Sequence, residues 1–503
     1  MKKAFSAIRS IALLALLSTS APSQAADDVL RIGSKRFTES YILAEVLAQT
    51  AAPHTAVPPL LRSGLGNTAI VYAALRGGGI DLYAEYTGTI AQEILKSGTP
   101  GAPMTRASMN AALAPLGLGI AVPFGFNDGY ALAMRADRAD SLGIRSLADL
   151  TKHPELKLGL SNEFLGRADG WKGLAAQYRL PQSPTGLDHG LAYDAVGARQ
   201  VDVIDIYTTD AKIDSLGLRV LKDDGSYFPR YDAVVLYRLD VPQRFPQAWA
   251  ALQRLEGRID EPAMIAMNAR AELQGEAFDS IARRFLSGAP AAAAPVGFAG
   301  RLFGPDLARL TRQHLLLVGA SVGLALLIGV PLAIWVFAQV RLRAVVLGFA
   351  GLLQTIPSLA LLAVLISWLG AIGTLPALIA LTLYALLPIM RNTVTGLSEV
   401  PAGLRQAATA LGMTQRQNLW LVQLPLALPT LLAGVRTATT IAIGTATIAA
   451  FIGAGGYGER IVTGLALNDR NLLLAGALPA AALALLSEAL FEALEWLIRQ
   501  RRR

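Results

Sequence analysis

The chain has 503 residues, of which 53% are hydrophobic and 16% are charged, and its formal net charge is +8. This length exceeds a single hydrophobic core, and so few charges indicate that part of the chain lies in lipid. The absence of cysteine excludes disulfides, and four histidines without ligand spacing argue against a structural zinc site, so we expect no metal and no cofactor. The excess positive charge gathers beside apolar segments and in residues 499–503, which favours a membrane surface over a nucleic-acid groove.

The first 26 residues have the pattern of a secretory signal peptide. Three basic residues precede an apolar run, Ile11–Leu17, and small residues follow as far as Ala26. The run is shorter than the roughly 20 residues that cross a bilayer. We therefore predict a signal peptide over residues 1–26 and an exported domain behind it. The segment is either cleaved after Ala25 or Ala26 or retained uncleaved as an anchor, and the sequence leaves both open.

Residues 27–287 alternate short apolar strands with amphipathic helical stretches. Strand candidates include residues 29–33, 156–160, 201–207 and 233–237, and helix candidates include residues 40–50 and 66–76. The alternation predicts a soluble α/β domain with parallel sheets in two lobes. A ligand of such a domain is expected at the carboxyl ends of the strands.

A linker and a membrane domain follow. Residues 288–312 begin with a Pro- and Ala-rich segment without periodicity, which predicts a linker. Residues 313–503 then predict a transmembrane domain with about five helices. The apolar runs cover residues 314–338, 344–369, 374–390, 429–452 and 472–496.

The positive charges predict the orientation of these spans. If residues 27–287 are exported, five crossings place the C-terminal arginines inside the cell, together with Arg341, Arg343, Arg391, Arg405 and Arg416. Arg301, Arg309 and Arg312 stay outside and oppose this bias. The sequence therefore predicts a multi-pass protein of the bacterial inner membrane, in contact with lipid, with its soluble domain on the periplasmic or extracellular side.

Residues 399–428 interrupt the apolar pattern with a basic, amphipathic helix-turn-helix insertion. Its small residues and a turn glycine would form a compact, protruding helix pair on which a partner protein can dock closely. The motif positions of the insertion are Gln406, Ala407, Ala408, Gly412, Leu424 and Pro425. Their spacing resembles the signature loop of ABC importer permeases, which forms a cytoplasmic coupling helix on the ATPase subunit.

The resemblance carries two further expectations. The family usually has Glu where this chain has Gln406, so the contact with the ATPase is expected to be weaker or to be a hydrogen bond. The family also implies two copies of the membrane domain in one pathway, and hence a homodimer. Because the chain contains no Gly-x4-Gly-Lys-Ser/Thr phosphate loop, ATP hydrolysis falls to a separate ATPase subunit.

Five stretches of the exported part carry a family resemblance: residues 33–40, 81–89, 126–133, 205–210 and 223–231. They resemble the substrate-binding proteins of the glycine betaine, choline and carnitine osmoprotectant uptake family. Residues 436–447 and 451–458 resemble the permeases of that family. The resemblance implies a two-lobe periplasmic binding protein of type II, followed by an all-α ABC importer permease. Lobe one is expected to comprise residues 27–131 and 232–287, and lobe two residues 132–231.

The same resemblance implies an aromatic cage for a quaternary ammonium group, formed by Tyr86, Tyr130, Tyr207 and Tyr231. A trimethylammonium group has no N–H to donate, so the faces of aromatic rings must recognise it. Ser40, Thr89 and Asp128 are the expected polar contacts. Relatives often carry Gln and Asn at the Ser40 and Asp128 positions.

A carboxylate at Asp128 is expected to disfavour a solute carboxylate, which favours a choline-like ligand or ergothioneine over glycine betaine. Arg167 and Asp169 fit either a ligand contact or an interlobe salt bridge. Both interpretations stay open at this point.

These features predict the substrate-binding and permease subunit of an ATP-driven importer for a quaternary ammonium compound. The alternative is a membrane-anchored solute sensor without transport, which would lack an ATPase partner and ATP-dependent uptake. An enzyme has little support, because the sequence contains no evident constellation of nucleophile, base and orienting group.

Overall fold

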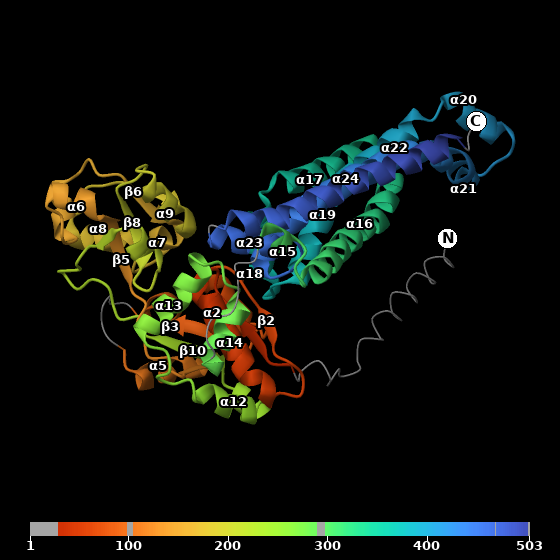
Figure 1. Cartoon of the computed structure of the whole chain (residues 1–503). Helices are drawn as coiled ribbons and strands as arrows, with labels where there is room; N and C mark the ends of the chain where they lie inside the picture. Colours follow the sequence, from red (N-terminus) through yellow and green to blue (C-terminus); the bar gives the residue numbers. More distant parts are fainter. Residues whose placement is uncertain (1–28, 98–103, 289–296, 468, 501–503) are drawn as a thin grey trace.

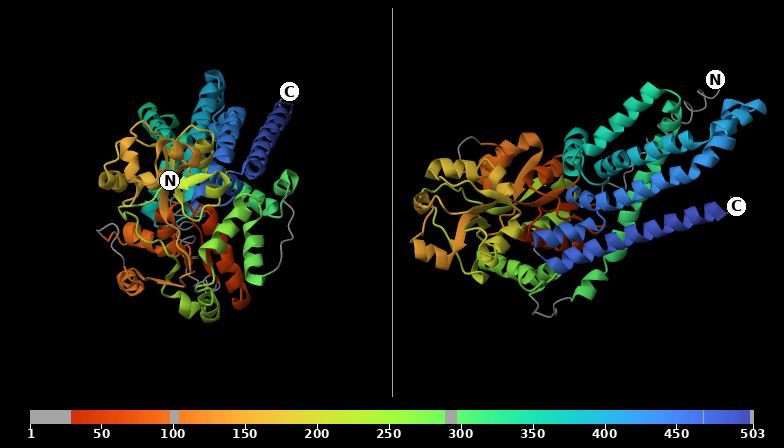
Figure 2. Two further views of the ribbon diagram at one scale, coloured as in Figure 1. Left: turned by 60° about the vertical axis from the view of Figure 1, so that its left-hand side comes forward. Right: turned by 90° about the horizontal axis from the view of Figure 1, so that it is seen from above.

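The computed structural model describes residues 29–97, 104–288, 297–467 and 469–500. The predicted signal peptide and residues 289–296 of the predicted linker therefore lie outside the described residues. Two α/β lobes sit at one end of a long helical bundle (Figure 1). The right-hand view of Figure 2 shows the same arrangement from above.

The first lobe is built on a five-stranded sheet with the order β2-β1-β3-β10-β4. Helix α2 is buried almost all round, because the sheet lies on one side of it and α12, α13 and α14 pack on the other. The strands are β1 (Arg31–Gly33), β2 (Leu60–Arg62), β3 (Leu82–Tyr86), β4 (Leu118–Ala121) and β10 (Ala233–Arg238). The helices are α2 (Thr38–Ala51), α3 (Thr68–Arg76), α4 (Thr87–Thr89), α5 (Arg106–Leu113), α11 (Val241–Arg244), α12 (Pro246–Gln253), α13 (Glu261–Glu272) and α14 (Phe278–Ser287), with short turns η1 (Ala52–His54), η2 (Ile90–Ile94) and η3 (Ala114–Leu116).

The second lobe contains another five-stranded sheet, with the order β7-β6-β8-β5-β9. The strands are β5 (Tyr130–Arg135), β6 (Leu158–Ser161), β7 (Thr185–Leu187), β8 (Val203–Tyr207) and β9 (Leu218–Val220). The helices are α6 (Ala136–Leu142), α7 (Asn162–Gly166), α8 (Trp171–Tyr178), α9 (His189–Gly197) and α10 (Lys212–Ser215), with the turn η4 (Ala148–Lys152). The predicted two-lobe α/β fold is thus confirmed.

The prediction of parallel sheets was wrong for one strand of each lobe. β10 runs antiparallel to β3 and β4, and β5 runs antiparallel to β8 and β9. Both strands enter their sheet directly from the other lobe. The parallel strands end at the cleft, whereas a strand that arrives from the other lobe begins there, so it must run in the opposite direction.

The chain passes between the lobes in two adjacent segments. Asn127 forms an isolated antiparallel bridge with Asp232, and the N–H of Asp128 donates to the carbonyl of Tyr231 at 3.1 Å. β5 follows the first segment at Tyr130, and β10 follows the second at Ala233. We therefore propose that the lobe boundaries lie at these two segments.

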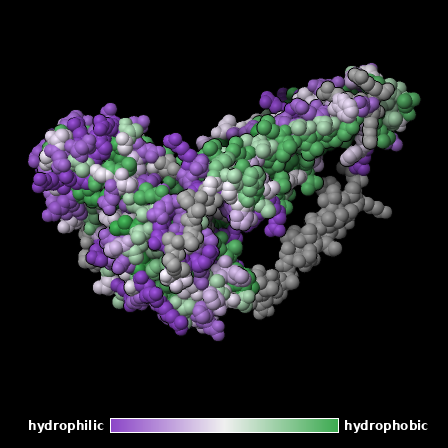
Figure 3. Space-filling view, viewed as in Figure 1, coloured by the Kyte–Doolittle hydropathy of each residue, from purple (hydrophilic) through white to green (hydrophobic). Residues whose placement is uncertain are grey.

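The bundle contains long apolar helices. Four described helices are long and apolar enough to cross a membrane, or up to five if the bent pair α17–α18 counts as one span. On the face shown in Figure 3, hydrophobic residues cover much of the bundle, whereas the lobes carry most of the hydrophilic surface. The helices are α15 (Phe298–Leu302), α16 (Leu307–Phe337), α17 (Val340–Thr355), α18 (Ser358–Leu369), α19 (Thr374–Glu399), α20 (Ala402–Ala410), α21 (Gln415–Asn418), α22 (Leu424–Ile448), α23 (Gly458–Ala466) and α24 (Arg470–Gln500), with turns η5 (Leu419–Gln423) and η6 (Ala449–Ile452).

The second predicted span, residues 344–369, is not one straight helix. α17 and α18 meet at an angle of 99° around Ile356 and Pro357. Proline lacks the N–H of the helical ladder, and it disfavours a helical conformation in the residue before it. Ile356 accordingly has an extended backbone, and its carbonyl accepts a hydrogen bond of 2.6 Å from the hydroxyl of Tyr384.

Each lobe touches the bundle at a different place. In lobe one the guanidinium of Arg36 lies 4.8 Å from the ring centroid of Phe451. A side-chain carbon at Gly77 would lie only 2.6 Å from the carbonyl oxygen of Gly370, so the two backbones are in close contact. In lobe two, α9 packs against α23. The bundle thus contacts both sides of the cleft.

Candidate functional site

The candidate site lies between the lobes, where several strands end. Tyr86 closes β3, Tyr207 closes β8, and Tyr130 opens β5 at the same edge, while Tyr231 lies in the crossing segment before β10. A cavity of about 220 Å³ opens beside Tyr207 and is lined by both lobes and by Ala466 of α23. Carboxyl ends of strands are where α/β domains of this kind hold ligands.

The aromatic rings form one continuous group. Tyr130 lies 5.0 Å from Tyr207 and 5.8 Å from Tyr231 between ring centroids. Phe37 links Tyr207, at 5.2 Å, to Tyr86, at 6.2 Å. The structure thus brings the four predicted tyrosines together, but Tyr86 joins the others only through Phe37. Burial raises the pKa of all four phenols well above the usual value, so each remains a neutral hydrogen-bond donor.

Two cationic side chains lie against these rings. The ammonium of Lys35 is 4.7 Å from the centroid of Tyr86, and the guanidinium of Arg167 is 4.9 Å from the centroid of Tyr130. Lys35 pairs with Glu85 at 2.6 Å. The rings therefore already contact cations of the chain itself, at distances typical of cation–π interactions.

Arg167 combines the two roles left open by the sequence. It forms a bidentate pair with Asp169, with both N–O distances at 2.7 Å, inside lobe two. Its Nη2 also donates to the hydroxyl of Thr89 in lobe one at 3.3 Å. Asp169 in turn accepts a hydrogen bond of 2.6 Å from the hydroxyl of Tyr231. The ion pair itself stays within one lobe, and the guanidinium reaches across the cleft.

The three predicted polar contacts lie in different environments. The hydroxyl of Ser40 accepts the backbone N–H of Lys35 at 2.8 Å, so it shapes the turn before α2. Thr89 receives the bond from Arg167 and lies at the cleft. Oδ1 of Asp128 accepts the N–H of Thr209 at 3.2 Å and lies 2.9 Å from the hydroxyl oxygen of the same residue, and burial raises the pKa of Asp128 well above the usual range.

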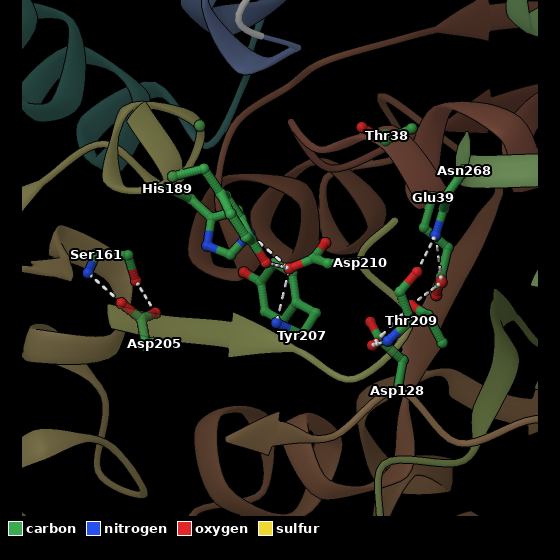
Figure 4. A network of polar contacts seen from close by, with 12 residues as sticks. Thr38, Glu39, Asp128, Ser161, His189, Asp205, Tyr207, Thr209, Asp210 and Asn268 are labelled. Carbon is green, nitrogen blue, oxygen red and sulfur yellow. Dashed lines mark hydrogen bonds and ion pairs between the residues drawn. The ribbon is translucent and has the colours of Figure 1, made fainter. Parts of the chain in front are cut away.

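A polar network lies next to these rings, and Figure 4 shows part of it around Glu39, Asp128 and Thr209. The hydroxyl of Tyr86 donates to Oε1 of Glu39 at 2.5 Å. The hydroxyl of Thr209 lies 2.6 Å from Oε2 of the same carboxyl group. Burial raises the pKa of Glu39 to about 7, although its hydrogen bonds with Thr209, Tyr86 and Asn268 lower it.

His189 is a further charged group beside the rings. Its ring centroid lies 4.4 Å from that of Tyr207, and its Nε2 is 3.1 Å from Oδ2 of Asp210. Burial alone would lower the pKa of His189, but the neighbouring Asp210 carboxylate raises it to about 9. The imidazole is therefore protonated at neutral pH.

Sequence reasoning missed Lys35, Phe37, Glu39 and His189 as site residues. The first three lie in the stretch that follows β1, and the rule that ligands sit at the carboxyl ends of strands would have selected them. His189 follows β7 at the start of α9. A lone histidine carried no spacing signal, and only the fold shows that it faces Tyr207.

The predicted coupling loop lies at the far end of the bundle from the lobes (Figure 1). Gln406 and Ala407 are exposed on α20, whereas Ala408 is buried. Gly412 has a φ of +80°, which favours glycine, and the side chain of Thr414 caps α21. Leu424 and Pro425 begin α22. Four large apolar side chains are exposed around this loop: Leu404, Leu411, Trp420 and Leu421.

Comparison with known proteins assigns both parts of the chain. Residues 28–288 match the family described as the substrate-binding domain of ABC-type glycine betaine transport systems. Residues 325–500 match the inner-membrane component of binding-protein-dependent transport systems. Together these two matches account for the lobes and for most of the bundle.

Individual relatives agree with this division. The osmoprotectant import permease protein OsmW of Salmonella typhimurium is 47% identical over 198 residues, which cover 39% of this chain and 89% of that protein. A glycine-betaine-binding protein of Pseudomonas aeruginosa is 34% identical over 294 residues, which cover 56% of this chain and 93% of that protein.

A third relative, the ergothioneine transport permease/ergothioneine binding protein EgtU of Helicobacter pylori, is 32% identical over 270 residues, which cover 51% of this chain and 47% of that protein. The chain therefore belongs to the family of ABC-type glycine betaine transport proteins, with a substrate-binding domain and the inner-membrane component of an importer in one polypeptide.

Proposed function

We propose that this chain is the substrate-binding and permease subunit of an ATP-driven importer for a quaternary ammonium compound, and that the preferred solute also carries a carboxylate. The observation that carries this proposal is the continuous group of aromatic rings between the lobes, with Lys35 and Arg167 against its outer members. Relatives named for glycine betaine, carnitine, choline and ergothioneine support the solute class.

The rings suit the ammonium end of such a solute. A trimethylammonium group offers no N–H, so a protein recognises it through the negative faces of rings, at about 0.5–2 kcal/mol for each contact. Tyr86, Tyr130, Tyr207 and Tyr231 are our proposed cage, with Phe37 as a fifth ring. Closure of the lobes around the solute would bring the two halves of this group together.

The two cations suit the carboxylate end. Among the described residues, the hydrogen bonds of Arg167 use Nε and Nη2, which leaves Nη1 for a solute oxygen. Lys35 and Thr89 lie on the facing lobe. The expected repulsion between Asp128 and a solute carboxylate loses its main support, because the Asp128 oxygen is bound to Thr209. Glycine betaine, carnitine and ergothioneine all satisfy this charge pattern, and choline does not.

The test is solute binding to the full chain in lipid nanodiscs, with labelled glycine betaine as the probe and choline and ergothioneine as competitors. Tyr207→Ala and Tyr130→Ala are expected to weaken binding at least about tenfold, or about 1.4 kcal/mol, and Tyr207→Phe far less because the ring remains. Tyr72→Ala, at a half-buried tyrosine of α3 that packs against another part of the lobe-one core, is the matched control. Equal losses of affinity for Tyr207→Phe and Tyr207→Ala would contradict recognition of the ammonium by the Tyr207 ring. Tighter binding of choline than of glycine betaine would contradict the proposal that the preferred solute carries a carboxylate.

We propose in addition that a separate ATPase subunit docks on α20, α21 and η5, and that two copies of the chain pair through their membrane parts. The exposed apolar side chains Leu404, Leu411, Trp420 and Leu421 support the docking surface. Solute uptake into vesicles that requires both ATP and a copurified ATPase tests the first proposal. A dimer mass in nanodiscs tests the second. Binding without uptake would favour the sensor instead.

A further inference from the structure

The buried side chains of Glu39, Asp128 and Thr209 lie next to Tyr86 and have too few hydrogens for the hydrogen bonds between them. The hydroxyl oxygen of Thr209 lies 2.6 Å from Oε2 of Glu39 and 2.9 Å from Oδ1 of Asp128. A hydroxyl has a single hydrogen and can donate to only one of these oxygens at a time. If both carboxyl groups were ionised, the other contact would bring two oxygens together without a hydrogen between them. One carboxyl group must therefore carry a proton and donate it to Thr209.

The surroundings make this proton necessary. Glu39, Asp128 and Thr209 are each at most 4% exposed, and no Lys, Arg or His side chain of the described residues forms an ion pair with either carboxyl group. Asn268 of α13 donates from Nδ2 to the Thr209 carbonyl at 3.0 Å and to Glu39 at 3.4 Å. Its own Oδ1 is buried without a hydrogen-bond partner, a second sign that the cluster is short of donors.

Other charged groups near the pair already have partners. On the loop before α2, Lys35 is paired with Glu85 of β3. Beyond β8, Asp210 is held by His189 and by the hydroxyl of Tyr193. On α13, Glu272 accepts a hydrogen bond from Thr38. The remaining ionisable neighbour is Tyr86, which donates to Glu39.

We propose that Glu39 and Asp128 form a proton site that tunes capture of the cation: in the solute-bound state the pair holds one proton, on Asp128, and Glu39 is ionised beneath Tyr86. This inference rests on the proposed function of the aromatic rings. Glu39 acts as a positioning residue, because it holds the Tyr86 hydroxyl and does not itself contact the solute. A negative charge on Glu39 makes the Tyr86 ring more electron-rich and attracts the trimethylammonium group.

The direction of the pH effect follows from linkage. A bound cation stabilises the ionised form of Glu39, so binding releases the proton that Glu39 carries at low pH. Because burial raises the pKa of Glu39 to about 7, most molecules must lose a proton on binding at pH 6 and few at pH 8. For one proton with this pKa, the affinity is expected to rise about tenfold from pH 6 to pH 8. His189, with a pKa of about 9, stays protonated through most of this window.

The experiment measures glycine betaine binding to the full chain in nanodiscs between pH 6 and pH 8. Wild type is expected to show the tenfold rise, and Glu39→Gln a flat profile that lies below the wild-type value even at pH 6, because the amide stands for the protonated form. Asp128→Asn is expected to keep the slope, because Glu39 still carries the titrating proton and the amide, like the protonated acid, has no charge. Glu45→Gln is the matched control: Glu45 lies on the same helix and burial raises its pKa, but Gln49 is its partner.

Proton release gives a second reading that a purely structural role would not change. Calorimetry in buffers of different ionisation enthalpy is expected to show nearly one proton released at pH 6 in wild type and none in Glu39→Gln. A wild-type slope that persists in Glu39→Gln would overturn the proposal. The same conclusion would follow if Glu39→Gln bound the probe as tightly as wild type at pH 8.

Infrared spectra without solute test the shared proton by itself. At pH 8, where Glu39 with its pKa of about 7 is largely ionised, wild type is expected to show a carboxylic-acid band that is mostly lost in Asp128→Asn. If this band is present but no probe binds at any pH, the proposed function fails while the proton site stands. If the band is absent, the proton site fails whether or not the solute binds.

Discussion

At the scale of single residues, Arg167 connects the two ends of the proposed solute. Its guanidinium lies against the Tyr130 ring, where the ammonium is expected, and it donates to Thr89 across the cleft. The bidentate pair with Asp169 fixes the plane of the guanidinium. A flexible lysine ammonium at this position could keep the charge but could not hold the same geometry.

Arg167→Lys is therefore expected to weaken binding of glycine betaine at least about tenfold, and binding of choline by less than about threefold. The difference arises because choline has no carboxylate for this group to bind. Competition binding to the full chain measures both. Arg219→Lys, at the surface pair with Asp140, is the control. Equal losses for the two solutes would show that Arg167 only supports the fold.

The positions of these residues along the chain could be predicted from the sequence, but most of their side-chain contacts could not. Tyr86 and Tyr207 could be placed at strand ends from the pattern of apolar strands and from the motifs around them. Ser40 and Asp128 occupy the expected positions along the chain, yet the side chain of one binds the Lys35 backbone and that of the other binds Thr209. The direction of a side chain depends on partners far away in sequence, such as Thr209 for Asp128, and no local pattern contains them.

At the scale of elements, the bend between α17 and α18 shows what a proline does inside a span. Pro331, Pro388, Pro429 and Pro479 lie within helices that continue past them. At Pro357 the chain turns instead. The free carbonyl of Ile356 there has a donor, the hydroxyl of Tyr384 on the next helix. A span of correct length could be predicted from hydropathy, but the bend could not, because it depends on this partner.

Tyr384→Phe is expected to loosen the bend, because the Ile356 carbonyl loses its donor in a largely apolar setting. The cost of such a loss is about 1–3 kcal/mol. Hydrogen exchange at the amides of residues 353–360 is therefore expected to accelerate at least about fivefold in the full chain. Tyr457→Phe, whose hydroxyl donates to Thr311, is the control. Unchanged exchange at the bend would mean that packing alone maintains it.

At the scale of the whole molecule, the two lobes contact different parts of the membrane domain. Lobe one contacts the turn after α18 through Gly77 and Gly370, and lobe two contacts the end of α23 through Gly190. Opening or closing the cleft must therefore change the distance between these two contacts, or break one of them. The order of domains along the chain could be predicted from composition, whereas these contacts join surfaces that no periodicity identifies.

The contact of lobe two can be tested within one helix. A side-chain carbon at Gly190 would lie 3.0 Å from the carbonyl oxygen of Ala466 and 3.1 Å from that of Leu465, closer than such atoms normally approach. At Gly197, at the other end of α9, the nearest atom would be 3.9 Å away. Gly190→Ala should thus push α9 away from α23, and Gly197→Ala should not.

If both lobes must stay on the bundle for transfer of the solute, Gly190→Ala will reduce ATP-driven uptake several-fold while solute affinity changes much less. Uptake into vesicles and binding in nanodiscs measure the two quantities on the same protein. Gly197→Ala is expected to leave both at the wild-type level. Equal reductions in uptake and affinity would place Gly190 in solute binding, and unaltered uptake would mean that the α9–α23 contact is not needed for transfer.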